Sequence, residues 1–106
     1  MVDAPPRRLE WSDAAADDLA AIHKFIARDS AHYAGLLVAH LVAAVDRLVA
    51  FPLSGRVVPE YQQDDLREVI HGNYRIVYRV HVDAVRVLTV FHAARLIPQD
   101  IERRNG

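Results

Sequence analysis

Basic side chains recur through the last third of this 106-residue chain, among residues that alternate between apolar and polar. Arg67, Arg75 and Arg79 fall within the alternating segments, and Arg95 follows them. Because a guanidinium group keeps its charge in proteins, each arginine must meet either water or an acidic partner. Gathered positive charge of this kind attracts carboxylates and phosphate groups. The pattern therefore predicts a basic surface that binds an anionic partner or a phosphate.

Three predicted strands would hold these side chains. Two of them meet at His71-Gly72-Asn73, and the third follows Val82-Asp83. Glycine accepts a positive φ without steric cost and asparagine tolerates it, so Gly72-Asn73 indicates a tight hairpin. Side chains alternate between the two faces of a strand. One face of the middle strand then holds Tyr74, Ile76, Tyr78 and Val80, and the other holds Arg75, Val77, Arg79 and His81.

The pairing register of the second hairpin decides whether the basic residues gather. One register places Arg75 opposite His92, and the alternative places Arg79 opposite Arg86. Because opposed like charges are unfavourable, the first register is favoured. Both registers place Arg75, Arg79 and His92 on one face, with Arg95 just beyond the strand end. A slip of a single residue would separate them.

Two amphipathic helices are predicted ahead of these strands. Ser12 and Ser30 can each cap a helix by accepting a backbone N–H, and Pro52 stops the second helix. Residues 52–65 then form a loop. The apolar residues at helical spacing are Trp11, Ala15, Leu19, Ile22 and Ile26 in the first helix, and Tyr33, Leu37, Leu41, Ala44 and Leu48 in the second.

The predicted element order is strand, helix, helix, strand, strand, strand (β-α-α-β-β-β). Residues 7–11 form the first strand, and a short C-terminal tail begins at Pro98. Apolar helix faces need a sheet to cover, so the order indicates a two-layer α+β fold with an N-terminal strand, a helical hairpin and a three-stranded antiparallel meander. The first strand should join at an edge or beside the third meander strand. The length suits one domain, residues 1–106.

Composition narrows the function classes. Residues 1–65 carry six Lys/Arg and ten Asp/Glu (−4), and residues 66–106 carry seven and four (+3), so the total is −1. General nucleic-acid binding is not favoured by this balance. The absence of cysteine excludes disulfides and thiolate metal sites, and the six histidines lack metal-ligand spacing, so no metal or other cofactor is expected. The start lacks a secretion signal and residues 35–51 are too short to span a bilayer, which predicts a cytoplasmic protein with no membrane partner.

Surplus apolar residues predict a partner. The chain is 52% hydrophobic, which is more than two thin layers can hide. An exposed groove beside the helical hairpin could receive an amphipathic helix, and two copies of the chain could cover the same surface as a homodimer. The residues expected to form this groove are Leu36, Val38, Val45, Val49 and Val58.

A set of short motifs resembles a known family. The motifs are Phe51-Pro52-x-Ser54-Gly55-Arg56, Leu66-Arg67-Glu68, Tyr74-Arg75-Ile76-Val77-Tyr78-Arg79-Val80 and Val90-x-His92-x-Ala94-Arg95. In this order and spacing they resemble the ParE branch of the RelE/ParE superfamily, the toxins of bacterial type II toxin–antitoxin modules that are also called plasmid stabilisation proteins. The resemblance extends over almost the whole chain.

The resemblance implies a toxin held inactive by a cognate antitoxin, a ParD-like protein with a ribbon-helix-helix DNA-binding end. ParE toxins inhibit DNA gyrase, whereas RelE-type relatives cut messenger RNA on the ribosome. The gyrase target is favoured, and the ribonuclease is the alternative. Arg67, Arg75, Arg79 and Arg95 are the candidates for binding the target or the antitoxin.

The ribonuclease alternative would use Arg75, His92 and Arg95. The resemblance implies that the two arginines supply positive charge, and His92 could act as a general base because its ordinary pKa lies near neutrality. The best-defined relatives add lysines and a tyrosine at positions that are Leu66, Glu68 and about Ile101 here. None of these three can do that chemistry, and Glu68 would repel a phosphate, so the nuclease constellation is incomplete.

Overall fold

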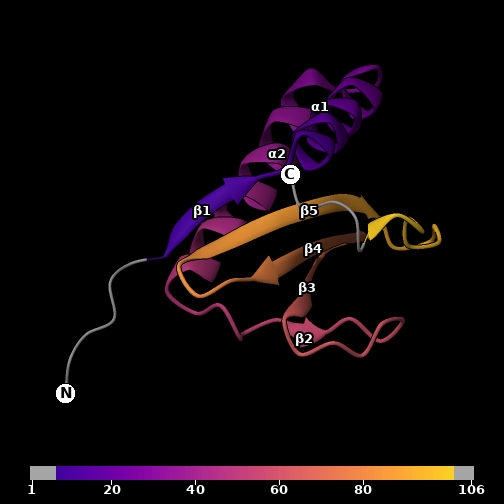
Figure 1. Ribbon diagram of the computed structural model, residues 1–106. Coiled ribbons are helices and arrows are strands. Elements are labelled where there is room, and N and C mark those ends of the chain that lie inside the picture. The colour runs from indigo at the N-terminus through magenta and orange to yellow at the C-terminus, as the bar shows by residue number, and fades with distance from the viewer. Residues whose placement is uncertain (1–6, 102–106) are drawn as a thin grey trace.

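The computed structural model describes residues 7–101; the remaining residues of the predicted domain, 1–6 and 102–106, lie outside the described part. A helical hairpin lies on one face of a sheet (Figure 1), which confirms the predicted α+β fold. The elements in chain order are β1 (Arg8–Trp11), α1 (Asp13–Ala27), α2 (Ala31–Asp46), a 3-10 turn η1 (Arg47–Val49), β2 (Arg56–Val57), β3 (Leu66–His71), β4 (Tyr74–Val80) and β5 (Ala84–His92).

The sheet has five strands in the order β1-β5-β4-β3-β2. β1 pairs in parallel with β5, and the other neighbours are antiparallel. The first strand was predicted either at an edge or beside the third meander strand. In the structure it occupies both positions, because β1 is an edge strand and its neighbour is β5. Strand β2 was not predicted, because two residues inside a loop give no alternation to detect. The tight turn is confirmed, with Gly72 at a φ of 56°.

The helices begin at the predicted caps. The Ser12 hydroxyl accepts from Ala15 N, and the Ser30 hydroxyl accepts from Tyr33 N. Tyr33 was expected in the core and is instead 55% exposed, because it lies in the first turn of α2, beyond the sheet. The main core lies between helices and sheet and is built from Ala15, Leu37, Leu41, Ala44, Val45, Ile76, Val87 and Val90.

The predicted pairing of β4 with β5 is wrong. Arg75 lies opposite Phe91, and Arg79 lies opposite Arg86, the pair that charge repulsion argued against. The register shifts between Val77 and Tyr78, where Leu88 of β5 is left as an extra residue, which is a β-bulge. The like charges are tolerated because each guanidinium group has a carboxylate of its own.

Several of the surplus apolar residues are not exposed. Val45 and Val58 are fully buried, whereas Leu36 is exposed as expected. The stretch 31–49 forms a helix long and apolar enough to cross a membrane, longer than the sequence suggested. Leu37, Leu41 and other buried residues of this stretch pack in the core.

The second face of the sheet is covered by Val58 and Tyr61 of the loop and by Ile97 and Ile101 of the tail. Val58, Leu66, Val77, Leu88, Phe91 and Ile101 form a separate small core there. On the helix-facing side, where it packs with Leu48 and Val85, Tyr78 anchors the start of the loop, because its hydroxyl donates to Pro52 O at 2.7 Å and accepts from Gly55 N at 3.0 Å. Burial raises the pKa of Tyr78, which keeps that hydroxyl protonated as a donor.

Gly55→Ala is expected to destabilise the protein by about 1–3 kcal/mol, the usual cost of overpacking a tight site. A Cβ at position 55 would lie 2.5 Å from both Glu68 O and Tyr78 Oη. Gly35→Ala is the matched control, because a Cβ at that position of α2 meets nothing within 4 Å. It should stabilise the helix by about 0.5–1 kcal/mol. Urea unfolding of the two variants measures both changes, and equal effects would contradict the described loop packing.

Candidate functional site

The basic residues predicted to form one surface do not converge. Opposed residues share a face of the sheet, so Arg75 and its partner Phe91 lie on the face opposite to the helices. His92 lies on the other face, opposite Tyr74. The side chains of Arg75 and Arg79 share the same face of β4, yet each is bound to its own carboxylates. The prediction that one face gathers Arg75, Arg79 and His92 is therefore wrong, and the one-residue difference in register is the reason.

Arg75 lies at the centre of an ion cluster in which Arg75 and Glu68 are buried, whereas Glu60 and Arg56 are exposed. Its two terminal nitrogens reach the two carboxylate oxygens of Glu60 at 2.8 and 2.9 Å, and its Nε donates to Glu68 at 2.6 Å. Glu68 is fully buried and binds Arg56 through its other oxygen at 2.5 Å. The Arg75 guanidinium also lies 5.1 Å from the centre of the Phe91 ring. The donors of Arg75 are thus directed at protein carboxylates.

The protonation states of this cluster follow from the contacts. The hydrogen bonds to Arg75 lower the pKa of Glu60 below its usual value, and the same bonds to Glu60 raise the pKa of Arg75. Both groups therefore remain charged at neutral pH. A buried charge that loses its partner is strongly destabilising, so this geometry indicates a structural role for Arg75.

The other arginines of the sheet are also engaged. Arg79 pairs with Asp65 at 2.8 Å, and Arg86 pairs with Glu10 at 2.9 Å. Arg67 binds backbone carbonyls, including Asp64 O at 2.8 Å and Gly55 O at 3.1 Å. Its charge therefore has no carboxylate partner among these contacts, in contrast to Arg79 and Arg86.

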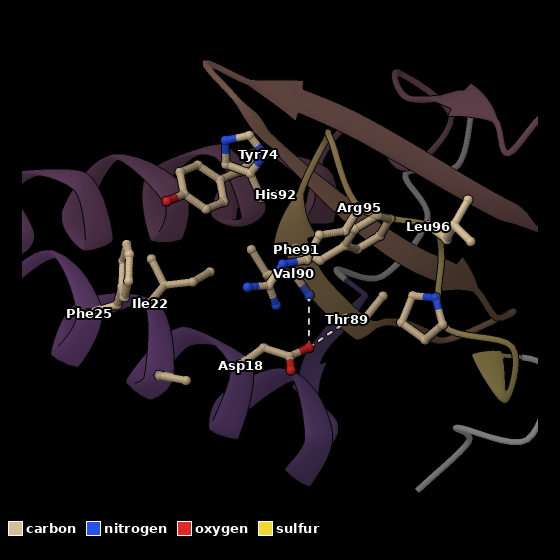
Figure 2. Close-up of a pocket in the computed structure, with 12 residues that line it drawn as sticks. Asp18, Ile22, Phe25, Tyr74, Thr89, Val90, Phe91, His92, Arg95 and Leu96 are labelled. Carbon is tan, nitrogen blue, oxygen red and sulfur yellow. Dashed lines mark hydrogen bonds between the residues drawn. The ribbon is translucent and has the colours of Figure 1, made fainter.

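His92 and Arg95 do come together, in a groove of about 650 Å³. The groove lies between α1 and the end of β5 with the segment that follows it, and Figure 2 shows Ile22 and Phe25 of α1 on one side and Tyr74 and His92 on another. Tyr74 and His92 meet edge to face, with ring centres 5.5 Å apart. Phe25 is 63% exposed. The groove combines an apolar lining with the cation of Arg95 and the carboxylate of Asp18, which suits a protein segment that carries both apolar and charged side chains.

The groove follows an edge of β5 that β1 does not reach. β1 ends at Trp11, opposite Val87, and beyond that point the helix supplies the hydrogen-bond partners of β5. The Ser12 hydroxyl donates to Leu88 O at 3.1 Å. The Asp18 carboxylate accepts from Val90 N at 3.1 Å and from the Thr89 hydroxyl at 2.7 Å (Figure 2). Polar contacts from α1 thus fix the bulged part of β5.

The hydrogen bonding of His92 limits its chemistry. Its Nδ1 accepts from the backbone N–H of Ala94 at 3.1 Å. In a neutral imidazole one nitrogen is an acceptor and the other carries the proton, so Nε2 of His92 is a donor in this arrangement. A general base would need its lone pair on the nitrogen that faces the substrate. His92 is therefore better suited to donating a hydrogen bond within the groove.

Three residues of these sites had escaped the sequence reasoning. Glu60 binds Arg75 from a loop, and Phe25 and Asp18 line the groove from α1. An acidic residue in a loop gives no signal of its long-range partner. Phe25 does not fall on the helical spacing of the core residues. That spacing could have indicated that its apolar side chain is exposed. Within residues 7–101, no cluster of three potential metal-binding side chains occurs.

Glu60→Gln is expected to lower stability at neutral pH and to change its dependence on acid. The pKa of Glu60 is lowered on folding, so the stabilisation is present above the unfolded value of about 4.5 and is lost as the pH falls through the folded value. The wild type and Glu60→Gln should therefore differ most near pH 7 and converge as the pH falls through the lowered folded pKa of Glu60. Urea unfolding across this range measures the difference, and a constant gap would contradict the ion pair.

Comparisons with known proteins agree with this architecture. The sequence model of the ParE toxin of the type II toxin–antitoxin system parDE matches residues 9–97. Protein Y4kP of Sinorhizobium fredii (strain NBRC 101917 / NGR234), a candidate toxin by its name, is 35% identical over 95 residues, which cover 88% of this chain and 95% of that protein.

Two solved structures share the fold. One belongs to a chromosomal ParDE toxin–antitoxin system from P. aeruginosa, with a TM-score of 0.67, 21% identity, and coverage of 81% of this chain and 95% of the other. The second belongs to the RelBE2 toxin–antitoxin complex of Mycobacterium tuberculosis, with a TM-score of 0.61, 22% identity, and coverage of 83% and 99%. With the family match over residues 9–97, the chain belongs to the ParE toxin family of type II toxin–antitoxin systems, within the RelE/ParE superfamily.

Proposed function

We propose that this toxin acts in the cytoplasm by inhibiting DNA gyrase through direct contact, and that a cognate ParD-like antitoxin with a ribbon-helix-helix end neutralises it. Membership of the ParE family supports the proposal. The observation that carries the choice of target is the engagement of Arg75 by Glu60 and Glu68. An arginine already bound by two carboxylates is a poor ligand for a phosphate.

Cleavage of RNA through its 2′-oxygen would need a base, an acid and cations around the phosphate. Arg75 would have to exchange its contacts with Glu60 and Glu68 for contacts with the substrate. Breaking a buried ion pair leaves an uncompensated charge that costs about 3–5 kcal/mol. The same carboxylates would repel the incoming phosphate. These costs favour action by contact over catalysis.

One observation favours the alternative, a ribosome-dependent messenger RNA endoribonuclease. His92 and Arg95 line the same groove, so two of the three candidate catalytic residues are neighbours. Arg75 lies on the opposite face, and His92 presents a donor rather than a basic nitrogen. The alternative would therefore require a different arrangement of all three residues on the ribosome.

The groove beside α1 is the proposed site for the antitoxin. Its apolar lining includes Ile22, Phe25 and Tyr74, and Arg95 adds a positive charge to the lining. An amphipathic segment could bury its apolar side chains against this lining and place a carboxylate near Arg95. Toxin–antitoxin complexes among the proteins of similar fold support a bound partner. A second copy of the toxin is the competing occupant.

The purified toxin is expected to block DNA supercoiling by gyrase, to accumulate cleaved DNA, and to leave messenger RNA intact in a translating extract. The reason is that Arg75 has a structural role, so no complete cation set surrounds a phosphate. Supercoiling gels and primer extension on the messenger RNA measure the two activities. Messenger RNA cleavage that Arg75→Lys or His92→Gln abolishes would contradict the proposal and support the nuclease.

Phe25→Asp is expected to weaken binding of the cognate antitoxin by at least about tenfold, because it places a charge in the apolar part of the groove. Tyr33→Asp is the matched control: Tyr33 is also more than half exposed on the helical hairpin but does not line the groove. Calorimetric titration with the antitoxin measures both affinities. Equal losses for the two variants, or no loss for Phe25→Asp, would place the antitoxin elsewhere.

A further inference from the structure

A second pocket lies toward the opposite edge of the sheet from the groove, where α2 ends beside β3. Its volume is about 340 Å³, and it shares no lining residue with the groove. The residues that matter for its chemistry are Arg47, Leu48, Phe51, Val69, Ile70 and His71. Phe51 is 66% exposed, and Ile70, whose side chain lies on the same face of the sheet as Arg75, is 51% exposed. Large apolar side chains in the open beside a hollow indicate a contact surface.

The backbone of β3 is also open at this pocket. Leu66 O accepts from Val58 N, so the backbone groups of Leu66 point toward the β2 side, and those of Ile70, four residues later, point the same way. β2 pairs only with Arg67 and Glu68 and does not reach Ile70. β1, the other edge strand, carries the ion-paired charges of Arg8 and Glu10, which discourage strand addition. Ile70, in contrast, has an uncharged side chain that does not discourage strand addition at its edge.

Two arginines lie in or beside this pocket. Arg47 lines the pocket and makes no ion pair within residues 7–101. Arg67 lies beside the loop at Ser54, another lining residue, and binds backbone carbonyls at Leu53 and Gly55. A ligand that neutralises these cations must carry carboxylates or phosphates. The adjoining apolar side chains and the open backbone edge favour a polypeptide over RNA.

We propose that this β3-edge pocket is where the toxin contacts its target, through an extended target segment that carries apolar and acidic side chains. The segment pairs with the backbone of Ile70 and adds a strand to the sheet. Side chains of an added strand alternate between the faces, so one set meets Phe51 in the pocket and the other meets the Ile70 side chain. Its carboxylates meet Arg47 and Arg67. The inference rests on the proposed function, with gyrase as the target, and assigns target and antitoxin to separate surfaces.

The test compares three toxin variants for gyrase inhibition and for antitoxin binding. Arg47→Glu/Phe51→Ser reverses the charge and removes the apolar contact. Ile70→Pro removes the outward N–H, which is a tolerated change at an open edge. Val82→Ser is the matched control, because Val82 is 95% exposed at the β4–β5 turn, far from the pocket in the sheet order. Thermal unfolding verifies that each variant is folded.

For each of the two pocket variants, the toxin concentration that blocks supercoiling should rise at least about tenfold. Both should bind the antitoxin as tightly as the wild type does. The control Val82→Ser should match the wild type in both assays. Unchanged inhibition by the folded Arg47→Glu/Phe51→Ser variant would overturn the inference while the proposed function stands. Loss of antitoxin binding with inhibition retained would assign the pocket to the antitoxin and also overturn it. If the wild-type toxin leaves gyrase active but cleaves messenger RNA, the proposed function is overturned. The inference that a segment of gyrase binds at this pocket then falls with it.

Discussion

The ion cluster around Arg75 is the interaction on which the rest of this structure depends. Glu60 comes from the loop, Glu68 from β3, Arg56 from β2 and Arg75 from β4, so the cluster ties the loop and three strands together. Because the carboxylates of the cluster are bound by arginines, the loop can pack on the second face of the sheet over the small apolar core. The same contacts occupy an arginine that the superfamily resemblance associates with RNA cleavage. The contacts that hold this face of the sheet together therefore also engage the donors of Arg75.

The sheet separates two kinds of surface as a consequence. On the helix side, the apolar groove beside α1 ends at His92 and Arg95, and the second pocket lies where α2 meets β3. On the other side, Arg75, Arg79 and Arg86 are held by carboxylates of the same chain. Arg95 in the groove and Arg47 in the second pocket lie next to apolar side chains. This distribution is consistent with a toxin that works through protein contacts.

Local signals in the sequence were sufficient for most elements. Ser12 and Ser30 begin the helices because a hydroxyl at each cap satisfies a free N–H, and Gly72 makes the tight turn. The β-bulge at Leu88 could not be predicted in this way, since Ser12 and Asp18, more than 70 residues earlier, fix that part of β5. Because of that single extra residue, His92 lies on the opposite face of the sheet from Arg75. Glu68 was read as an obstacle to phosphate binding; it is also the partner that holds Arg75.

The central claim is that Arg75 is a structural cation closed to substrate, and side-chain NMR of Arg75 tests it most directly. With ¹⁵N-labelled toxin, the Nε–H signal should exchange slowly with water, because this group is buried against Glu68. It should also stay unshifted when a single-stranded RNA is added. Fast exchange in the free toxin, or a shift of this signal on addition of RNA, would show an accessible phosphate ligand and contradict the account.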